Sequence, residues 1–165
     1  MSREIDRSPS RVSTVTAVGA GFVAAATSAL VAPGALLAAV PGMLAVFLGL
    51  YRGSRRVLSV GVMGLLGGSM FAGAAGAPPL VVLCSVTAAV LTWDYASTAI
   101  SVGRQLGRRA DTARLERTHT LASLGVAAVT IVVSFGVFRS ITGTHPVATV
   151  FFLLLAALLL VGALR

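Results

Sequence analysis

Residues 57–77 read VLSVGVMGLLGGSMFAGAAGA, a stretch of 21 residues without a charged side chain. As a helix this stretch would be about 31 Å long, which matches the hydrocarbon thickness of a bilayer, about 30 Å. The whole sequence has the same character, because 56% of the 165 residues are hydrophobic and only 11% are charged. A soluble domain carries about a quarter charged residues, so the composition predicts a multi-pass integral protein of the cell membrane.

Five further stretches are long and apolar enough, or nearly so, to cross a membrane as helices. The sequence therefore predicts an all-α, polytopic bundle of about six transmembrane helices in three hairpins. The second stretch is the shortest and contains Pro41, so it is either a kinked full span, which we favour, or re-entrant. The turns of the hairpins contain Pro33, Pro79 and Pro146, each placed to open the returning helix. The predicted helices are 14–32, 35–50, 57–77, 80–101, 121–138 and 146–164.

The basic residues predict the orientation of this bundle. All 13 are arginines, and they lie in short segments between the apolar stretches. With the N-terminus inside, twelve arginines lie inside and only Arg139 lies outside. Because arginines near membrane ends are retained in the cytoplasm, we expect both termini there. This clustering is typical of topology signals, so no nucleic-acid partner is expected despite the net charge of +8.

The longest polar stretch, 102–120, separates the fourth and fifth predicted helices. Val102 and Leu106 recur at helical spacing, and Asp111 is a candidate N-cap, which predicts a cytoplasmic helical hairpin at about 102–120. The expected domains are thus a cytoplasmic tail, 1–13, and a transmembrane domain, 14–165, that carries this hairpin. Its arginines either bind lipid headgroups, bind a partner protein or only fix the topology. They are Arg104, Arg108, Arg109, Arg114 and Arg117.

Small residues at a spacing of four predict where helices approach closely, because packing replaces hydrophobic drive between helices in lipid. Two such stripes lie on the third and fourth predicted helices, which we therefore expect to pack face to face. The stripes are Gly64, Gly68, Ala72 and Gly76, and Cys84, Ala88, Thr92 and Ala96. Cys84 is the only cysteine, which excludes an internal disulfide and a multi-cysteine metal site.

Asp94 is the one acidic residue within or near an apolar stretch. An ionised carboxylate in hydrocarbon is costly, so a proton or cation site is one interpretation. The other is that Trp93 and Tyr95 mark the membrane interface. There Asp94 can meet water, an arginine such as Arg52, Arg55 or Arg56, or the hydroxyls of Ser97 and Thr98. The flanking aromatic residues favour this second interpretation.

Other chemistry is not indicated. His119 and His145 fall on opposite sides of the predicted membrane, so they are expected to be separate, solvated interfacial residues and not a shared metal or relay site. The sequence contains no HExxH, GxSxG or Walker motif and no cluster of carboxylates. We therefore predict a protein that is not an enzyme, with no cofactor, no metal and no catalytic residue.

One segment resembles a known but uncharacterised family of small haloarchaeal multi-pass membrane proteins. In that family a Trp-Asp pair ends a helix, and a G-x-Q-L-G-R segment and a histidine follow before the next span. The matching residues here are Trp93, Asp94, Gly103, Gln105, Leu106, Gly107, Arg108, Asp111, Thr112, Glu116 and His119. The resemblance implies an accessory membrane subunit of a system with a MoxR-type ATPase, a von Willebrand-like protein and a transglutaminase-like membrane protein.

Two hypotheses about function follow from the sequence. The preferred one is a non-enzymatic accessory or scaffold subunit whose arginine-rich hairpin contacts a partner protein or lipid headgroups. The alternative is a small transporter or channel that uses Asp94 as an ion or proton site. Membrane lipids and another membrane or cytoplasmic protein are the expected partners, and the sequence is equally compatible with a homo-oligomer.

Overall fold

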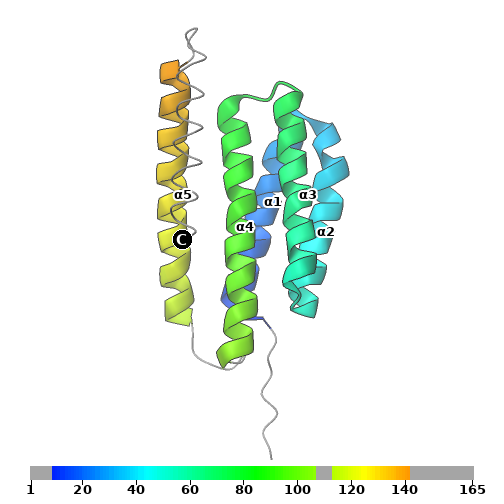
Figure 1. Cartoon of the computed structure of the whole chain (residues 1–165), viewed down its shortest axis with the longest axis vertical. Helices are drawn as coiled ribbons and strands as arrows, with labels where there is room; N and C mark the ends of the chain where they lie inside the picture. Colours follow the sequence, from blue (N-terminus) through cyan, green and yellow to red (C-terminus); the bar gives the residue numbers. More distant parts are fainter. Residues whose placement is uncertain (1–8, 107–112, 142–165) are drawn as a thin grey trace, which may run out of the picture. The chain divides into compact units, whose positions relative to one another are not determined.

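The computed structural model describes residues 9–106 and 113–141, and these residues form helices joined by short turns (Figure 1). The described part of the chain contains no strand, which confirms the all-α prediction. Five of the helices are long and apolar enough to cross a membrane. The elements are α1 (Arg11–Val31), a short 3-10 turn η1 (Pro33–Ala35), α2 (Leu36–Arg52), α3 (Arg55–Ala74), α4 (Pro79–Leu106) and α5 (Ala113–Ile141).

The five helices correspond to the first five predicted spans. The predicted sixth helix, 146–164, lies outside the described residues, so the count of six stays a prediction, as does the cytoplasmic side of the termini. The shortest predicted span is helical through Pro41 and, together with η1, gives a segment of 20 residues that can cross a membrane. Pro33 opens η1 and Pro79 opens α4, as expected from their missing N–H groups.

The chain divides into two compact units, Met1–Ile131 and Val132–Arg165. The first unit contains α1 to α4 and most of α5, and its core is built from small side chains. Within it, α2 packs most extensively against α3, and α1 against α4. The described part of the second unit is the end of α5.

The glycine stripe of α3 has a different partner from the one predicted. A Cβ on Gly64 would lie 2.6 Å from Gly42 Cα, and one on Gly61 would lie 2.5 Å from the backbone nitrogen of Val46. Gly61 and Gly64 therefore face α2 and not α4. The helices α3 and α4 also pack against each other, as expected, but through other residues such as Ser69 and Ser85. Gly68 faces Ala35 of η1 and Ala39 of α2. The physical reason is that α2 carries its own glycines, Gly42 and Gly49, and glycine against glycine gives the closest backbone approach.

The small-residue stripe of α4 is largely buried, but part of it faces α1. Ala88, Thr92 and Ala96 are buried, whereas Cys84 is only partly covered. Thr92 Cγ2 lies 3.5 Å from the position of a Cβ on Gly21, which lies in α1. Gly76 belongs to no helix face, because α3 ends at Ala74 and Gly76 adopts a left-handed turn with φ of 86°.

Three serines link α1, α3 and α4 inside the bundle. Ser85 Oγ lies 2.5 Å from Ser28 Oγ and 2.6 Å from Ser69 Oγ, and all three residues are at most 1% exposed. Ser28 and Ser69 can also donate to the carbonyl oxygens of Ala24 and Leu65 on their own helices. The cluster satisfies its hydroxyls without water, as a site inside an apolar bundle requires.

Candidate functional site

One end of the first unit gathers the arginine-bearing ends of all its helices. The backbone N–H of Ser10, before α1, donates to the carbonyl of Ala99 in α4. Arg55 Nη2 at the start of α3 donates to Ser101 Oγ in α4 over 2.6 Å. Arg104 Nη2 in α4 donates over 2.6 Å to the carbonyl of Gly53, the left-handed residue that ends α2. These contacts place helix ends that are far apart in the sequence side by side at one end of the first unit.

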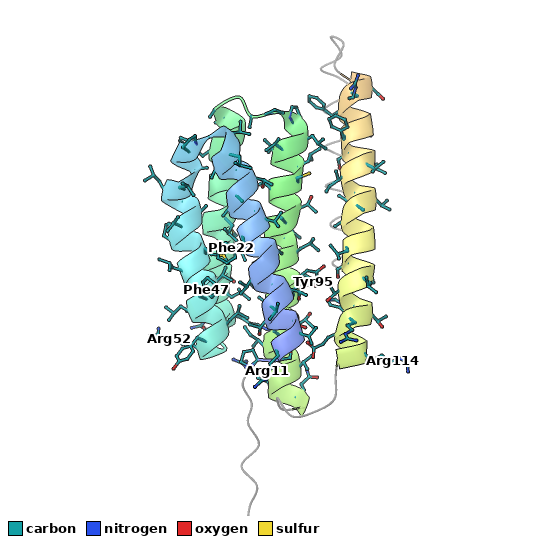
Figure 2. All side chains as sticks on the ribbon, turned by 180° about the vertical axis from the view of Figure 1, so that it is seen from behind. Arg11, Phe22, Phe47, Arg52, Tyr95 and Arg114 are labelled. Atoms are coloured by element: carbon teal, nitrogen blue, oxygen red, sulfur yellow. The ribbon has the colours of Figure 1, made fainter. Side chains whose placement is uncertain are left out.

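We call this region the basic end, because the exposed charges that residues 9–106 and 113–141 place there are all guanidinium groups. Figure 2 shows three of them, Arg11, Arg52 and Arg114, at the same end of their helices. Arg55 and Arg104 make the hydrogen bonds described above, and the structure gives the other five no ion pair among the described residues. Of the predicted hairpin arginines, Arg108 and Arg109 lie outside the described residues. The exposed set is Arg11, Arg52, Arg55, Arg56, Arg104, Arg114 and Arg117.

Glu116 is the acidic residue of the basic end, and it is buried rather than exposed. Its side chain is 2% exposed, and its Oε2 accepts hydrogen bonds from Ser10 Oγ, Ser13 Oγ and the Ser13 backbone N–H at 2.7–2.9 Å. The carboxylate therefore caps the N-terminus of α1 from α5, where the helix dipole favours a negative charge.

Asp94 pairs with His119 across α4 and α5. His119 Nε2 lies 3.1 Å from Asp94 Oδ2, and Ser123 Oγ donates to the same oxygen over 2.7 Å. Thr98 Oγ1 lies 3.3 Å from His119 Nε2. His119 is 37% exposed, which agrees with a partly solvated residue, but its ring also contacts the Asp94 carboxylate, and this contact was not expected. The expected arginine partner is also replaced, since Arg55 bonds to Ser101 instead.

The contacts of α5 with the rest of the first unit form a group that we call the polar clamp. It consists of Glu116, His119, Thr120 and Ser123, all in the first three turns of α5. The clamp is completed by Tyr95, whose hydroxyl donates to the Thr120 carbonyl over 3.2 Å and whose ring meets the His119 ring edge-on. The clamp thus attaches α5 to α1 through Glu116 and to α4 through the other three residues.

The spacing of the four clamp residues is a sequence signal that none of the motifs considered above includes. Residues 116, 119, 120 and 123 follow a spacing of three, four and seven, which places them on one face of a helix. Polar residues at this spacing in an otherwise apolar helix predict a polar face turned toward the protein. The partners Ser10, Ser13 and Asp94 lie on other helices and are not indicated by any local pattern.

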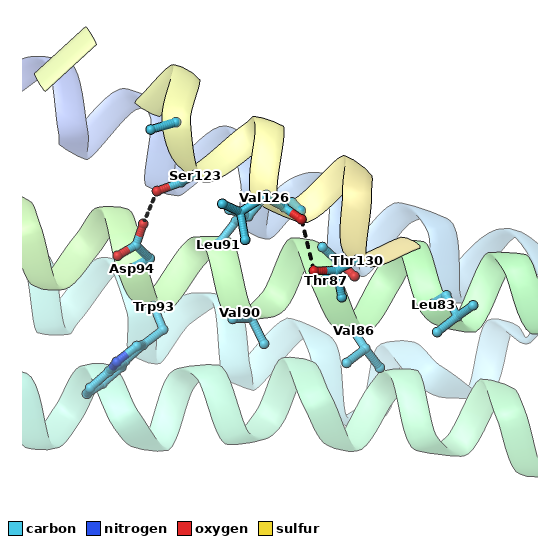
Figure 3. Close-up of a pocket in the computed structure, with 12 residues that line it drawn as sticks. Leu83, Val86, Thr87, Val90, Leu91, Trp93, Asp94, Ser123, Val126 and Thr130 are labelled. Atoms are coloured by element: carbon cyan, nitrogen blue, oxygen red, sulfur yellow. Dashed lines mark hydrogen bonds between the residues drawn. The ribbon is translucent and has the colours of Figure 1, made fainter. Parts of the chain in front are cut away.

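A groove of about 650 Å³ runs between α4 and α5 beyond the clamp (Figure 3). Its lining is mostly valine, leucine and alanine, with Asp94 and Ser123 toward one end. Thr87 and Thr130 form a second polar position, seven residues further along each helix. This arrangement can hold a polar group or water between two transmembrane helices, beside an acid and an imidazole.

Comparison with known proteins assigns the chain to a family. The model of the family of unknown function DUF7519 matches residues 7–161, which is most of the chain, so the chain belongs to this family. The prediction of an uncharacterised family is confirmed in this respect, whereas the haloarchaeal source and the motif stay predictions. No curated protein and no solved structure matches the chain.

Proposed function

Because membership of a family of unknown function carries over no activity, we propose from the geometry that this membrane protein is a non-enzymatic accessory subunit. In this proposal the basic end faces the cytoplasm and binds an acidic segment of a partner protein. The observation that supports it most is the gathering of seven exposed arginines from five helices at one end, around a buried Glu116.

The physical argument is one of electrostatic complementarity. Like charges held close together repel one another, and a partner with carboxylates relieves this repulsion while it is steered to the surface. Arg114 and Arg117 lie in the first two turns of α5, which the polar clamp holds in place. Their charges are therefore presented by an ordered helix, which reduces the entropy lost on binding.

Binding of fluorescent poly-glutamate to the full chain in neutral detergent micelles tests this proposal. We expect Arg114→Gln/Arg117→Gln to slow association about tenfold at low salt, because rates of electrostatically steered association fall when charges are removed. The matched control is Arg139→Gln, which removes an arginine from the far end of α5. It is expected to leave the association rate unchanged.

Two results would count against the acidic partner. One is an equal association rate for the wild type and the Arg114→Gln/Arg117→Gln variant. The other is a preference for vesicles of anionic lipid over poly-glutamate at the same salt concentration, which would favour the lipid headgroups instead. Neutral vesicles and 0.5 M salt serve as the references, since both remove the electrostatic contribution.

The alternative function, a small transporter or channel, is favoured by one specific observation. Asp94, predicted as its ion or proton site, contacts His119 and Ser123 beside a groove between two transmembrane helices. Intramembrane ionisable residues mark ion pathways more often than they serve packing alone. In liposomes that contain the full chain, a panel of H⁺, Na⁺ and K⁺ gradients should reveal a flux that Asp94→Asn abolishes. If no ion crosses faster than in protein-free liposomes, this function is excluded.

A further inference from the structure

We infer that Asp94 and His119 form a proton-relay site that exchanges protons with the basic end. This inference rests on the transporter alternative, and it adds the ion, the second carrier and the side of entry. It is carried by the 3.1 Å contact between His119 Nε2 and Asp94 Oδ2, by its depth in the bundle and by the groove that opens beside it.

The depth of Asp94 follows from the contacts of α4. Arg55 reaches Ser101, which marks the level of guanidinium groups at the basic end. Asp94 lies seven residues further along α4, or about 10 Å deeper at 1.5 Å per residue. The pair therefore lies about two helical turns from these guanidinium groups, with 35–37% of each side chain exposed. A lone carboxylate within a membrane span is costly, whereas a pair that carries one proton has no net charge.

The donors around Asp94 favour a proton over a metal cation. Ser123 Oγ donates to Asp94 Oδ2, and His119 Nε2 approaches the same oxygen. A metal cation needs several ligating side chains, and the described residues hold no group of three His, Cys, Asp or Glu that could bind one, whereas a proton needs only this pair. A carboxylate and an imidazole within 3.2 Å of one another are placed for direct proton transfer.

The relay step moves one proton from the His119 ring to the Asp94 carboxylate and changes no bond outside these two side chains. The N–H bond at Nε2 of the imidazolium breaks, and an O–H bond forms at Asp94 Oδ2, which gives neutral imidazole and neutral carboxylic acid. This step leaves the net charge of the pair at zero, with the remaining ring hydrogen on Nδ1. The carboxylic acid then releases its proton toward the groove, and a proton from water at the basic end adds to the free Nε2 and restores the imidazolium.

The groups around the pair fit this role. Tyr95 meets the His119 ring edge-on, and its hydroxyl donates a hydrogen bond to the Thr120 carbonyl oxygen. Tyr95 therefore orients the His119 ring and does not donate a hydrogen bond to Asp94. Glu116 lies one turn earlier on α5 and is occupied by Ser10 and Ser13 of α1. The hydroxyl of Thr120 is buried without a hydrogen-bond partner in residues 9–106 and 113–141, which leaves one polar atom of the clamp available for water.

The groove provides the next polar position along the path. Thr87 and Thr130 lie in its wall, about 10 Å beyond Asp94 and Ser123 at the rise of an α-helix (Figure 3). Thr130 Oγ1 donates to the carbonyl of Val126 on its own helix, so its lone pairs face no donor of α5. Between the two polar positions the wall is formed by Val90, Leu91 and Val126.

Proton uptake into pyranine-loaded liposomes that contain the full chain tests the inference. A potassium diffusion potential set by valinomycin drives the protons inward. We expect the wild type to acidify the lumen faster than protein-free liposomes, and Asp94→Asn and His119→Gln each to lower this rate at least tenfold. His145→Gln is the matched control, because it changes the only other histidine, and it is expected to retain the wild-type rate.

The outcomes separate this inference from the functions proposed above. A flux of Na⁺ or K⁺ without protons overturns the relay but leaves the transporter alternative, and a wild-type proton rate in His119→Gln overturns the relay in the same way. An absence of any flux overturns both, whereas binding of poly-glutamate at the basic end is unaffected. Circular dichroism and size-exclusion profiles verify folding, and Ser123→Ala, which keeps both carriers, should show an intermediate rate if Asp94→Asn does not fold.

Discussion

The interface between α2 and α3 and the attachment of α5 hold helices together in different ways. In the first, glycines let the two backbones touch, and a Cβ on Gly49 would lie 2.7 Å from the backbone nitrogen of Leu58. In the second, four residues near the start of α5 make polar contacts, and the large side chains beyond them, such as Val126 at 68% and Val129 at 63%, are exposed. One interface depends on shape and the other on a few hydrogen bonds.

This difference implies different responses to disturbance. Close-packed helices resist small shifts, because any movement loses many dispersion contacts at once. A helix attached by polar groups can detach when one of these groups loses its partner, at a cost of a few kcal/mol. Proteins place their moving parts where few apolar contacts are made, and α5 with its groove has this property in the first unit.

The largest effect is expected from a methyl group at the glycine interface. Gly61→Ala would place its Cβ 2.5 Å from the Val46 nitrogen and 2.7 Å from the Gly42 carbonyl oxygen, and neither backbone atom can move aside cheaply. We expect a loss of about 3 kcal/mol or more in the free energy of unfolding, measured by thermal melting in detergent. Gly19→Ala is the control, because nothing lies within 4 Å of its Cβ position. Equal melting temperatures for the two variants would refute the close backbone approach.

Much of the first interface could be predicted from the sequence, but its partner could not. The apolar length of residues 57–77 and the spacing of Gly64 and Gly68 predict a transmembrane helix with a small-residue face. Both features depend only on neighbouring residues in the sequence, so they can be predicted without knowledge of the fold. Which neighbour receives that face depends on the whole arrangement of helices, and in the structure Gly42 of α2 lies against it.

The site was harder to predict for the same reason. Asp94 was recognised because a carboxylate in an apolar stretch is unusual by itself. Its partner His119 is 25 residues away, across a turn whose path no pattern fixes, and so was interpreted as solvated. The burial of Glu116 by two serines of α1 cannot be inferred from its neighbours Leu115 and Arg117.

A smaller and more local effect is expected from the polar clamp. Glu116→Gln removes the negative charge that accepts three hydrogen bonds at the N-terminus of α1. Hydrogen bonds to charged groups contribute about 1.5–3 kcal/mol, so α5 should detach more often while α1 to α4 stay folded. Hydrogen exchange should therefore quicken in the first turns of α1 and α5 but not in α2 or α3. Ser59→Ala, whose hydroxyl bonds only to its own helix, is the control. Faster exchange throughout all five helices would show that the clamp and the packed helices unfold as one unit.

The smallest effect is expected where polar contacts lie inside the packed region, and this case distinguishes polarity from packing. Ser85→Ala removes the central hydroxyl of the serine cluster, but Ser28 and Ser69 keep acceptors at the carbonyls of Ala24 and Leu65 on their own helices. No donor is then left unsatisfied, and polar contacts between transmembrane helices contribute about 0.6 kcal/mol on average. We expect a change of about this size in the free energy of unfolding, measured by the same thermal melts as for Gly61→Ala. A loss above about 2 kcal/mol would mean that hydrogen bonds hold α1 against α4, as they hold α5. Packing cannot account for a loss of that size, because Ser85→Ala removes one hydroxyl and leaves Ser28 and Ser69 with acceptors on their own helices.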